Sequence, residues 1–183
     1  MDRNTIFRAR EAGPDDVAAI ARIEVETWRA TYAGMLPDRV LIGMSERRQQ
    51  GAWAGLVRFR PGDVVVVEEP LSGIVGFGNC GTQRDPSLPY SGEIFTLYVA
   101  PDAQNRGVGR RLMTVLFRRL LHNGCPSALV WVIRANPSRF FYEHLGGRLV
   151  LTRRIRVGGE PVEAIAYGWP DLAAALRALA PPP

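Results

Sequence analysis

The sequence predicts an α/β fold in which one mixed sheet of about seven strands has helices on both faces. The first observation is the order of segments, which reads strand, two helices, three strands, helix, strand, helix and two strands. The second is size: 183 residues, of which 46% are hydrophobic and 22% charged, suit one core of ordinary dimensions. We therefore expect a single domain over residues 1–183, with its core at about 5–170.

The N-terminal third is expected to hold one strand and two helices. Residues 5–11 form the strand, and Pro14-Asp15-Asp16 begins a helix that reaches about Tyr32. Proline suits the first turn, and the two carboxylates complement the positive end of the helix dipole. A turn at 36–38 leads to a second, more basic helical stretch that reaches about Val57.

The rest of the chain alternates between short apolar strands and two amphipathic helices. Four consecutive valines, 64–67, indicate a strand that is buried on both faces. Glycine and proline punctuate the boundaries between segments. The expected strands are 63–69, 74–80, 93–99, 128–133, 148–156 and 162–169, and the expected helices are 108–123, 136–145 and a short last one before a frayed tail at 181–183.

The composition excludes several classes of function. All 23 basic residues are arginine, so the chain has neither a Schiff-base lysine nor the GK[ST] of a phosphate-binding P-loop. Cys80 and Cys125 form no CxxC pair, and no carboxylates cluster near His122 or His144, so we expect no disulfide framework and no metal. The arginines behind the net charge of +5 are scattered, which argues against nucleic acid as a partner.

The N-terminus is charged, and no run of about 18 apolar residues occurs. We therefore expect no membrane partner and a cytoplasmic protein.

A glycine-rich segment, QNRGVGRR at 104–111, lies between a predicted strand and a predicted helix. Glycines let the backbone approach a ligand, and the free N–H groups at a helix start bind phosphate. Arg106, Arg110 and Arg111 add positive charge there. Two glycines can equally shape a tight strand-to-helix turn, so the segment alone leaves both interpretations open. It does not match the G-x-G-x-x-G of dinucleotide-binding enzymes, because the last glycine is missing.

With its surroundings, this segment resembles the acyl-CoA signature Q/R-x-x-G-x-G/A of the GNAT acyltransferase superfamily, matched by Gln104, Gly107 and Gly109. The resemblance extends to LYVAPDAQNRGVG, to NPSRFFYEHLGG and, more loosely, to ETWRATYAGMLPD. It implies an N-acetyltransferase that moves an acetyl group from acetyl-CoA to a primary amine by direct attack, with residues 92–147 as the acyl-CoA-binding and catalytic region. A non-catalytic acyl-CoA-binding sensor of the same fold is the alternative.

The resemblance also implies a position for acetyl-CoA. The pantetheine arm would lie where two parallel strands, ending at Val99 and Ile133, splay apart, and the first strand would carry a bulge that frees an N–H for the thioester carbonyl. The diphosphate would rest on the start of the next helix. The residues expected to bind acetyl-CoA are Leu97, Tyr98, Val99, Gln104, Asn105, Arg106, Gly107, Val108, Gly109, Arg110 and Asn136.

Two residues are expected to handle protons, since an alkylammonium must lose a proton and the CoA thiolate gains one. By the resemblance, Glu93 is the candidate base, direct or through water, and Tyr142 the candidate acid. A strand-edge carboxylate and a core aromatic are the respective structural interpretations. Asn136 and Tyr142 are six residues apart, against seven in many relatives, which leaves the aim of the tyrosine open.

The acceptor side is less defined by sequence. Trp28 and Tyr32 share a helix face in the region that borders the acceptor pocket in the family, so we expect them to contact the amine. Core packing is the other interpretation of this pair, and we expect a structural role for Trp131 and Trp169. The identity of the amine, the acyl-chain preference and whether the chain forms a homodimer stay open.

Overall fold

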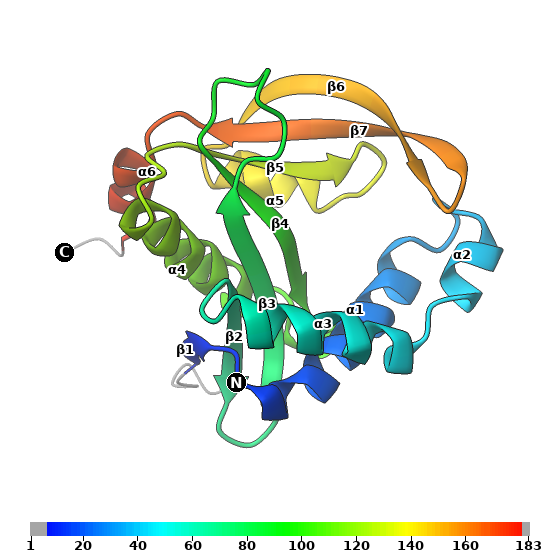
Figure 1. Cartoon of the computed structure of the whole chain (residues 1–183). Helices are drawn as coiled ribbons and strands as arrows, with labels where there is room; N and C mark the ends of the chain where they lie inside the picture. Colours follow the sequence, from blue (N-terminus) through cyan, green and yellow to red (C-terminus); the bar gives the residue numbers. More distant parts are fainter. Residues whose placement is uncertain (1–6, 181–183) are drawn as a thin grey trace.

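The computed structural model describes residues 7–180, and its centre is one seven-stranded sheet with the strand order β1-β2-β3-β4-β5-β7-β6 (Figure 1). All neighbouring strands are antiparallel except β4 and β5, which are parallel. The predicted mixed sheet is thereby confirmed. The strands are β1 (Arg8–Glu11), β2 (Val64–Glu69), β3 (Gly73–Thr82), β4 (Gly92–Val99), β5 (Ala128–Ile133), β6 (Arg148–Val157) and β7 (Glu160–Trp169).

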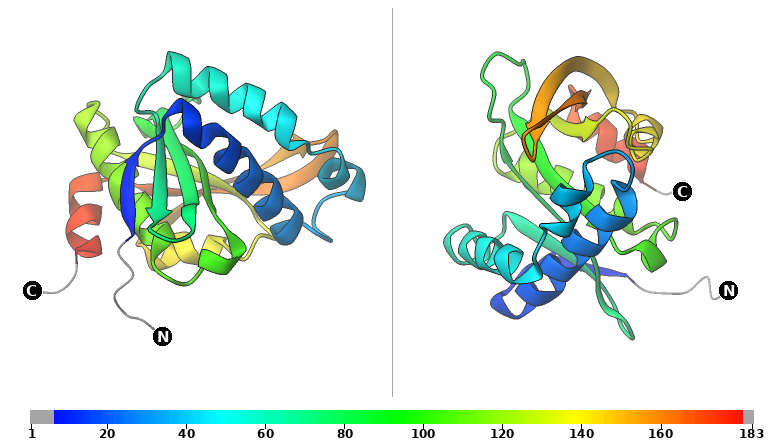
Figure 2. Two further views of the ribbon diagram at one scale, coloured as in Figure 1. Left: turned by 90° about the horizontal axis from the view of Figure 1, so that it is seen from below. Right: turned by 90° about the vertical axis from the view of Figure 1, so that its right-hand side faces the viewer.

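Helices cover both faces of this sheet, as expected. One face is covered by α1 and α3, and the other by α4 and α5 (Figure 2). Within residues 7–180, no helix has the length and apolarity needed to span a bilayer. The α-helices are α1 (Val17–Thr31), α2 (Asp38–Ile42), α3 (Glu46–Phe59), α4 (Val108–His122), α5 (Arg139–His144) and α6 (Leu172–Leu179), and 3-10 turns occupy Pro14–Asp16 and Pro101–Ala103.

Two helix boundaries differ from the prediction. The stretch expected to be one helix to about Val57 is two helices, because Gly43 ends α2 and Ser45 in an extended conformation precedes α3. The helix expected from Asn136 begins at Arg139, although Asn136 Oδ1 accepts from the Ser138 N–H just before it. The expectations for residues 5–6 and 181–183 lie outside the described residues.

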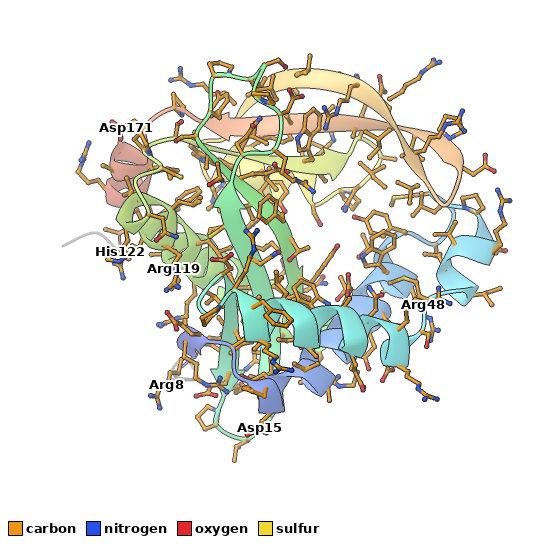
Figure 3. The ribbon with its side chains drawn as sticks, in the orientation of Figure 1. Arg8, Asp15, Arg48, Arg119, His122 and Asp171 are labelled. Carbon is orange, nitrogen blue, oxygen red and sulfur yellow. The ribbon has the colours of Figure 1, made fainter. Side chains whose placement is uncertain are left out.

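The core lies mainly between α4 and the strands β2 and β3. The four valines of β2 are at most 2% exposed, which confirms burial on both faces. Along α4, Leu112, Leu116 and Leu120 are fully buried. Each such side chain contributes about 1.5–3 kcal/mol relative to exposure. The labelled Arg8 and Arg48 lie far apart at the periphery (Figure 3), whereas Asp16, Glu24 and Glu93 are buried.

The parallel pair β4–β5 is the irregular part of the sheet. The two strands pair only from Gly92↔Ala128 to Ile94↔Val130 and then separate. On the other side of β4, Ile94 pairs with Cys80 and Thr96 with Asn79, so Phe95 is an extra residue without a partner on β3. A bulge and a splayed strand pair therefore coincide at Phe95.

Candidate functional site

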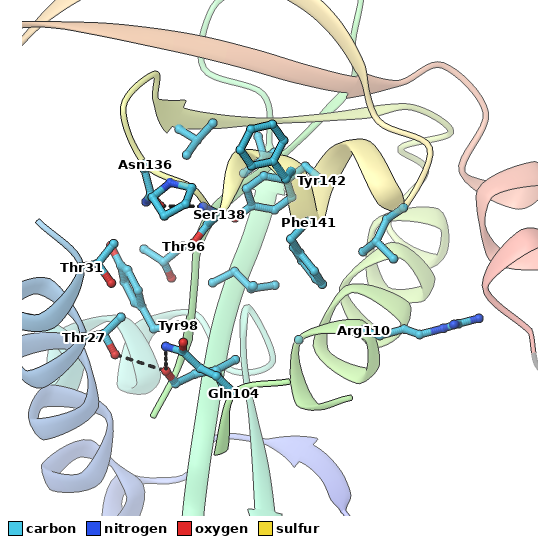
Figure 4. A pocket seen from close by; sticks show the side chains of 18 of the residues that line it. Thr27, Thr31, Thr96, Tyr98, Gln104, Arg110, Asn136, Ser138, Phe141 and Tyr142 are labelled. Atoms are coloured by element: carbon cyan, nitrogen blue, oxygen red, sulfur yellow. Dashed lines mark hydrogen bonds between the residues drawn. The ribbon is translucent and has the colours of Figure 1, made fainter. Parts of the chain in front are cut away.

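A cavity of about 800 Å³ opens where β4 and β5 separate (Figure 4). Its wall includes residues 95–99 of β4 and 130–132 of β5. On one side it reaches the end of α1, with Thr27, Thr31 and Tyr32, and on the other it reaches α5 and the start of α4. One cavity thus joins the splayed strands to the glycine-rich segment.

The start of α4 has the geometry of an anion cradle. Gly107 precedes the helix with φ +86°, and a Cβ built on it would meet no atom within 4 Å. Asn105 also has a positive φ, of 58°. The first N–H groups of a helix lack partners within the helix. Because Asn105, Gly107 and Gly109 line the cavity, they leave room for a phosphate group at the positive end of the α4 dipole.

Most of the residues predicted to bind acetyl-CoA line this cavity, and two do not. Arg106 forms an ion pair with Glu69 and its guanidinium lies 5.2 Å from the Phe7 ring centroid, so it faces away from the cradle. Val108 is 1% exposed and packs in the core. The predicted residues in the wall are Leu97, Tyr98, Val99, Gln104, Asn105, Gly107, Gly109, Arg110 and Asn136.

Beyond Ile94, the edge of β4 that faces β5 has no strand partner. The carbonyl of Val99 accepts bonds from Gln104 Nε2 at 3.2 Å and from Thr27 Oγ1 at 3.4 Å (Figure 4). These contacts fix the end of β4 while the backbone of residues 95–98 keeps a free edge. An extended ligand can bind such an edge as an added strand does.

Tyr142 lies in the cavity wall on α5 and is 6% exposed. Its ring packs against Phe141 at 5.3 Å and against Tyr167 and Trp169, each at 6.3 Å between centroids. Burial raises the pKa of Tyr142. Among the described residues its hydroxyl has no hydrogen-bond partner. Tyr142 can therefore act as a proton donor toward a group in the cavity.

Tyr32 and Asn136 meet across the cavity. The Asn136 Nδ2 donates to the Tyr32 hydroxyl at 3.1 Å, and the Asn136 Oδ1 accepts from the Ser138 N–H at 2.8 Å. Burial raises the pKa of Tyr32. Trp28 is absent from the wall. It donates from Nε1 to the Tyr98 hydroxyl at 2.9 Å, so it positions Tyr98 instead of contacting the cavity.

Glu93, which the resemblance made the candidate base, lies outside the cavity wall. Its side chain is 3% exposed and is held by Arg84, whose Nε and backbone N–H both donate to Oε2, at 3.1 and 3.2 Å. The guanidinium Nη2 donates to Oε1. Because both of its oxygens accept from Arg84, this carboxylate anchors the loop before β4.

The cavity also contains residues that the sequence did not single out. Trp131, expected to be structural, lies in the wall, and so do Phe95, Thr96, Ser138 and His144. Alternation along a strand allows the Trp131 side chain to point to either face of the sheet. Because β4 separates from β5 beside it, the side chain borders the cavity instead of packing in the core. Within residues 7–180 no three His, Cys, Asp or Glu side chains gather as a metal site would require.

Comparisons with known proteins agree with this geometry. The model of the "Acetyltransferase (GNAT) family" matches residues 18–147. The chain is 32% identical over 165 residues to the uncharacterized N-acetyltransferase YuaI of Bacillus subtilis, covering 90% of this chain and 94% of YuaI.

Two solved structures share the fold, and one contains coenzyme A and the other acetyl-CoA. One is the PaiA N-acetyltransferase of Thermoplasma acidophilum in complex with coenzyme A, with TM-score 0.68, 17% identity and coverage of 87% of this chain and 98% of that one. The other is YncA of Salmonella typhimurium, a protein described as an acetyltransferase, with acetyl-CoA, with TM-score 0.62, 19% identity and coverage of 91% and 94%.

Proposed function

This chain belongs to the acetyltransferase (GNAT) family, and from that premise we propose that it transfers the acetyl group of acetyl-CoA to a primary amine by direct attack. The observation that carries the proposal is the coincidence, in one cavity, of the Phe95 bulge, the separation of β4 from β5 and the phosphate cradle at the start of α4.

The residues in the wall suit each part of acetyl-CoA. The free edge of β4 at residues 95–98 can hydrogen-bond the amides of the pantetheine arm. Asn105, Gly107 and Gly109 can hold the diphosphate through backbone N–H groups. Arg106 is not expected to bind the phosphates, because it forms an ion pair with Glu69.

The chemistry follows from where the arm would end. The unpaired backbone at Phe95 can polarise the thioester carbonyl, a contribution worth roughly 10²–10³ in rate at other oxyanion sites. The neutral amine attacks the carbonyl carbon, the C–N bond forms, and the C–S bond breaks. Tyr142 donates its hydroxyl proton to the departing thiolate, and the amine proton passes to solvent. Glu93 is outside the cavity wall, so we assign it no direct contact with the amine.

A titration and a turnover assay test the proposal together. Acetyl-CoA should bind saturably in calorimetry, and a pool of primary amines should make the protein release free CoA thiol. Because the chain contains no lysine, its own ε-amines cannot act as acceptors. Binding with no amine-dependent thiol release would favour the non-catalytic sensor, and no saturable binding would overturn the proposal entirely.

A pair of glycine variants localises the donor. Gly107→Val puts a branched side chain into the cradle and should weaken acetyl-CoA binding at least about tenfold, as expected for losing a charge-assisted hydrogen bond. Gly124→Val is the matched control, because Gly124 also has a positive φ, of 78°, and open space around its Cβ, but lies outside the cavity wall at the other end of α4. Equal affinity in both variants would show that the cradle is misplaced.

A further inference from the structure

Two aromatic side chains in the cavity wall, where the strands separate, are each stacked against an arginine that lies outside that wall. Phe95 of β4 and Trp131 of β5 both line the cavity, each one residue beyond the last β4–β5 pair, Ile94↔Val130. The Arg84 guanidinium lies 4.7 Å from the Phe95 ring centroid, and that of Arg153 lies 3.9 Å from the Trp131 centroid. We call these four residues the arginine–aromatic rim.

The rim is a built arrangement, because buried or cross-element contacts hold each arginine. Arg84 belongs to the loop between β3 and β4, which crosses over β7 toward β6 (Figure 1). It is anchored on the buried carboxylate of Glu93. Asp85 of the same loop accepts from Arg153 Nη1 of β6 at 3.0 Å. The loop therefore joins both stacks into one unit.

These contacts use only part of each guanidinium. Arg84 bonds Glu93 through Nε and Nη2, and Arg153 bonds Asp85 through Nη1. Within residues 7–180, Nη1 of Arg84 and Nε and Nη2 of Arg153 have no hydrogen-bond partner. Their side chains are 67% and 43% exposed. Arginine stacked on an aromatic ring keeps its edge N–H donors directed outward, where they can bind a carboxylate.

The cavity wall itself has no negative charge to hold a second ammonium group. Its side chains near the strand separation are uncharged hydroxyls, an amide and aromatic rings: Thr27, Thr31, Tyr32, Phe95, Thr96, Trp131, Asn136 and Ser138. Glu93 and Asp85 are engaged by the rim arginines. A di- or polyamine would therefore find no carboxylate in this wall for its second ammonium group.

We infer that the acceptor is a primary amine carrying a carboxylate close to the amine, as in an α-amino acid, and that Arg153 and Arg84 bind this carboxylate. The inference rests on the proposed acetyl transfer. Both stacks lie one residue beyond the Ile94↔Val130 pair, next to the Phe95 backbone where the thioester carbonyl would be polarised, so an acceptor whose carboxylate binds the guanidiniums would direct its nearby amine toward the thioester.

The test compares amino acids with their carboxamides, which lack the carboxylate charge, and with a diamine. Common L-α-amino acids, their carboxamides and putrescine are offered with acetyl-CoA, and kcat/KM is measured from thiol release and product mass. Arg153→Gln should lower the acid-to-amide ratio of kcat/KM about tenfold, the size expected for one charge-assisted hydrogen bond. The change in ratio between variants cancels the different basicities of the two amines.

Arg154→Gln is the matched control, because the next residue of β6 points to the opposite face of the sheet. It should leave the ratio unchanged. Arg153 is preferred to Arg84 for the test, since removing Arg84 would leave the Glu93 carboxylate buried without a partner.

An acid-to-amide ratio that is the same in the parent and in Arg153→Gln would overturn the inference. So would acetylation of putrescine that is more efficient than that of every amino acid. Both outcomes leave acetyl transfer itself intact. If no amine increases thiol release above the amine-free rate, the proposed function is refuted, and this assignment with it.

Discussion

Removing the hydroxyl of Tyr142 separates its chemical role from its packing role. In Tyr142→Phe the ring keeps its contacts with Phe141, Tyr167 and Trp169. The hydroxyl makes no hydrogen bond to a described residue, so the free energy of unfolding should change by less than about 1 kcal/mol, the usual worth of one such bond. The fold and the donor site should both survive the change.

The rate should respond differently. Loss of a positioned general acid lowers turnover by about 10²–10⁴-fold, which corresponds to about 3–5 kcal/mol of activation free energy. We expect kcat to fall by this factor, while the Kd for acetyl-CoA changes less than about twofold because the hydroxyl would contact only the sulfur. Thiol release under saturating acetyl-CoA measures the first quantity, and calorimetry measures the second.

The pH dependence gives a second readout. Burial raises the pKa of Tyr142 above its ordinary value of about 10, so the acid stays protonated throughout pH 6–9. Turnover of the parent should therefore show no falling limb from Tyr142 in this range. Any rise with pH reports deprotonation of the amine.

Tyr167→Phe is the control for this experiment. Tyr167 packs on the same ring but lies outside the cavity wall, and its hydroxyl bonds Glu143. It should retain near-parental turnover. Parental kcat in Tyr142→Phe, with the fold intact, would refute the assignment of Tyr142 as the acid.

Three further predictions concern groups outside the cavity. Glu93→Gln should lower the thermal midpoint, because Arg84 loses its charged partner, yet the pH dependence of kcat/KM should keep its shape; loss of a fall in kcat/KM at low pH would restore Glu93 as the base. Arg10 lowers the pKa of Asp16 through paired hydrogen bonds of 2.6 and 2.9 Å, so the stability from this pair is present above about pH 4 and is lost as pH falls through the lowered pKa. Asp16→Asn should therefore cost about 1–2 kcal/mol in urea unfolding at pH 7 and less at pH 2, and an equal loss at both would contradict the linkage. Burial raises the pKa of Cys80 to about 12, so a disulfide reagent at pH 8 should leave this thiol unmodified in the native protein and modify it in guanidinium; rapid native labelling would contradict the burial.

Local sequence determined the elements and the donor cradle. Gly107 is needed where the backbone turns into α4 with a positive φ, and that requirement is visible in the segment itself. The four valines of β2 likewise identify a doubly buried strand without reference to its neighbours. The resemblance selects Tyr142, and the sequence pattern places it on a helix, which the structure contains as α5.

Only tertiary structure decided the rest, because it depends on pairing between distant segments. The bulge at Phe95 exists relative to the register of β3, and no property of residues 92–99 alone reveals it. Glu93 is excluded from the cavity and Trp131 lines it, and contacts with distant segments decide both positions. Arg84, a loop residue, covers the Glu93 carboxylate, and the separation of β4 from β5 opens the Trp131 indole to the cavity. Side-chain alternation along a strand offers two faces, and the packing of the whole sheet determines which face a ligand can reach.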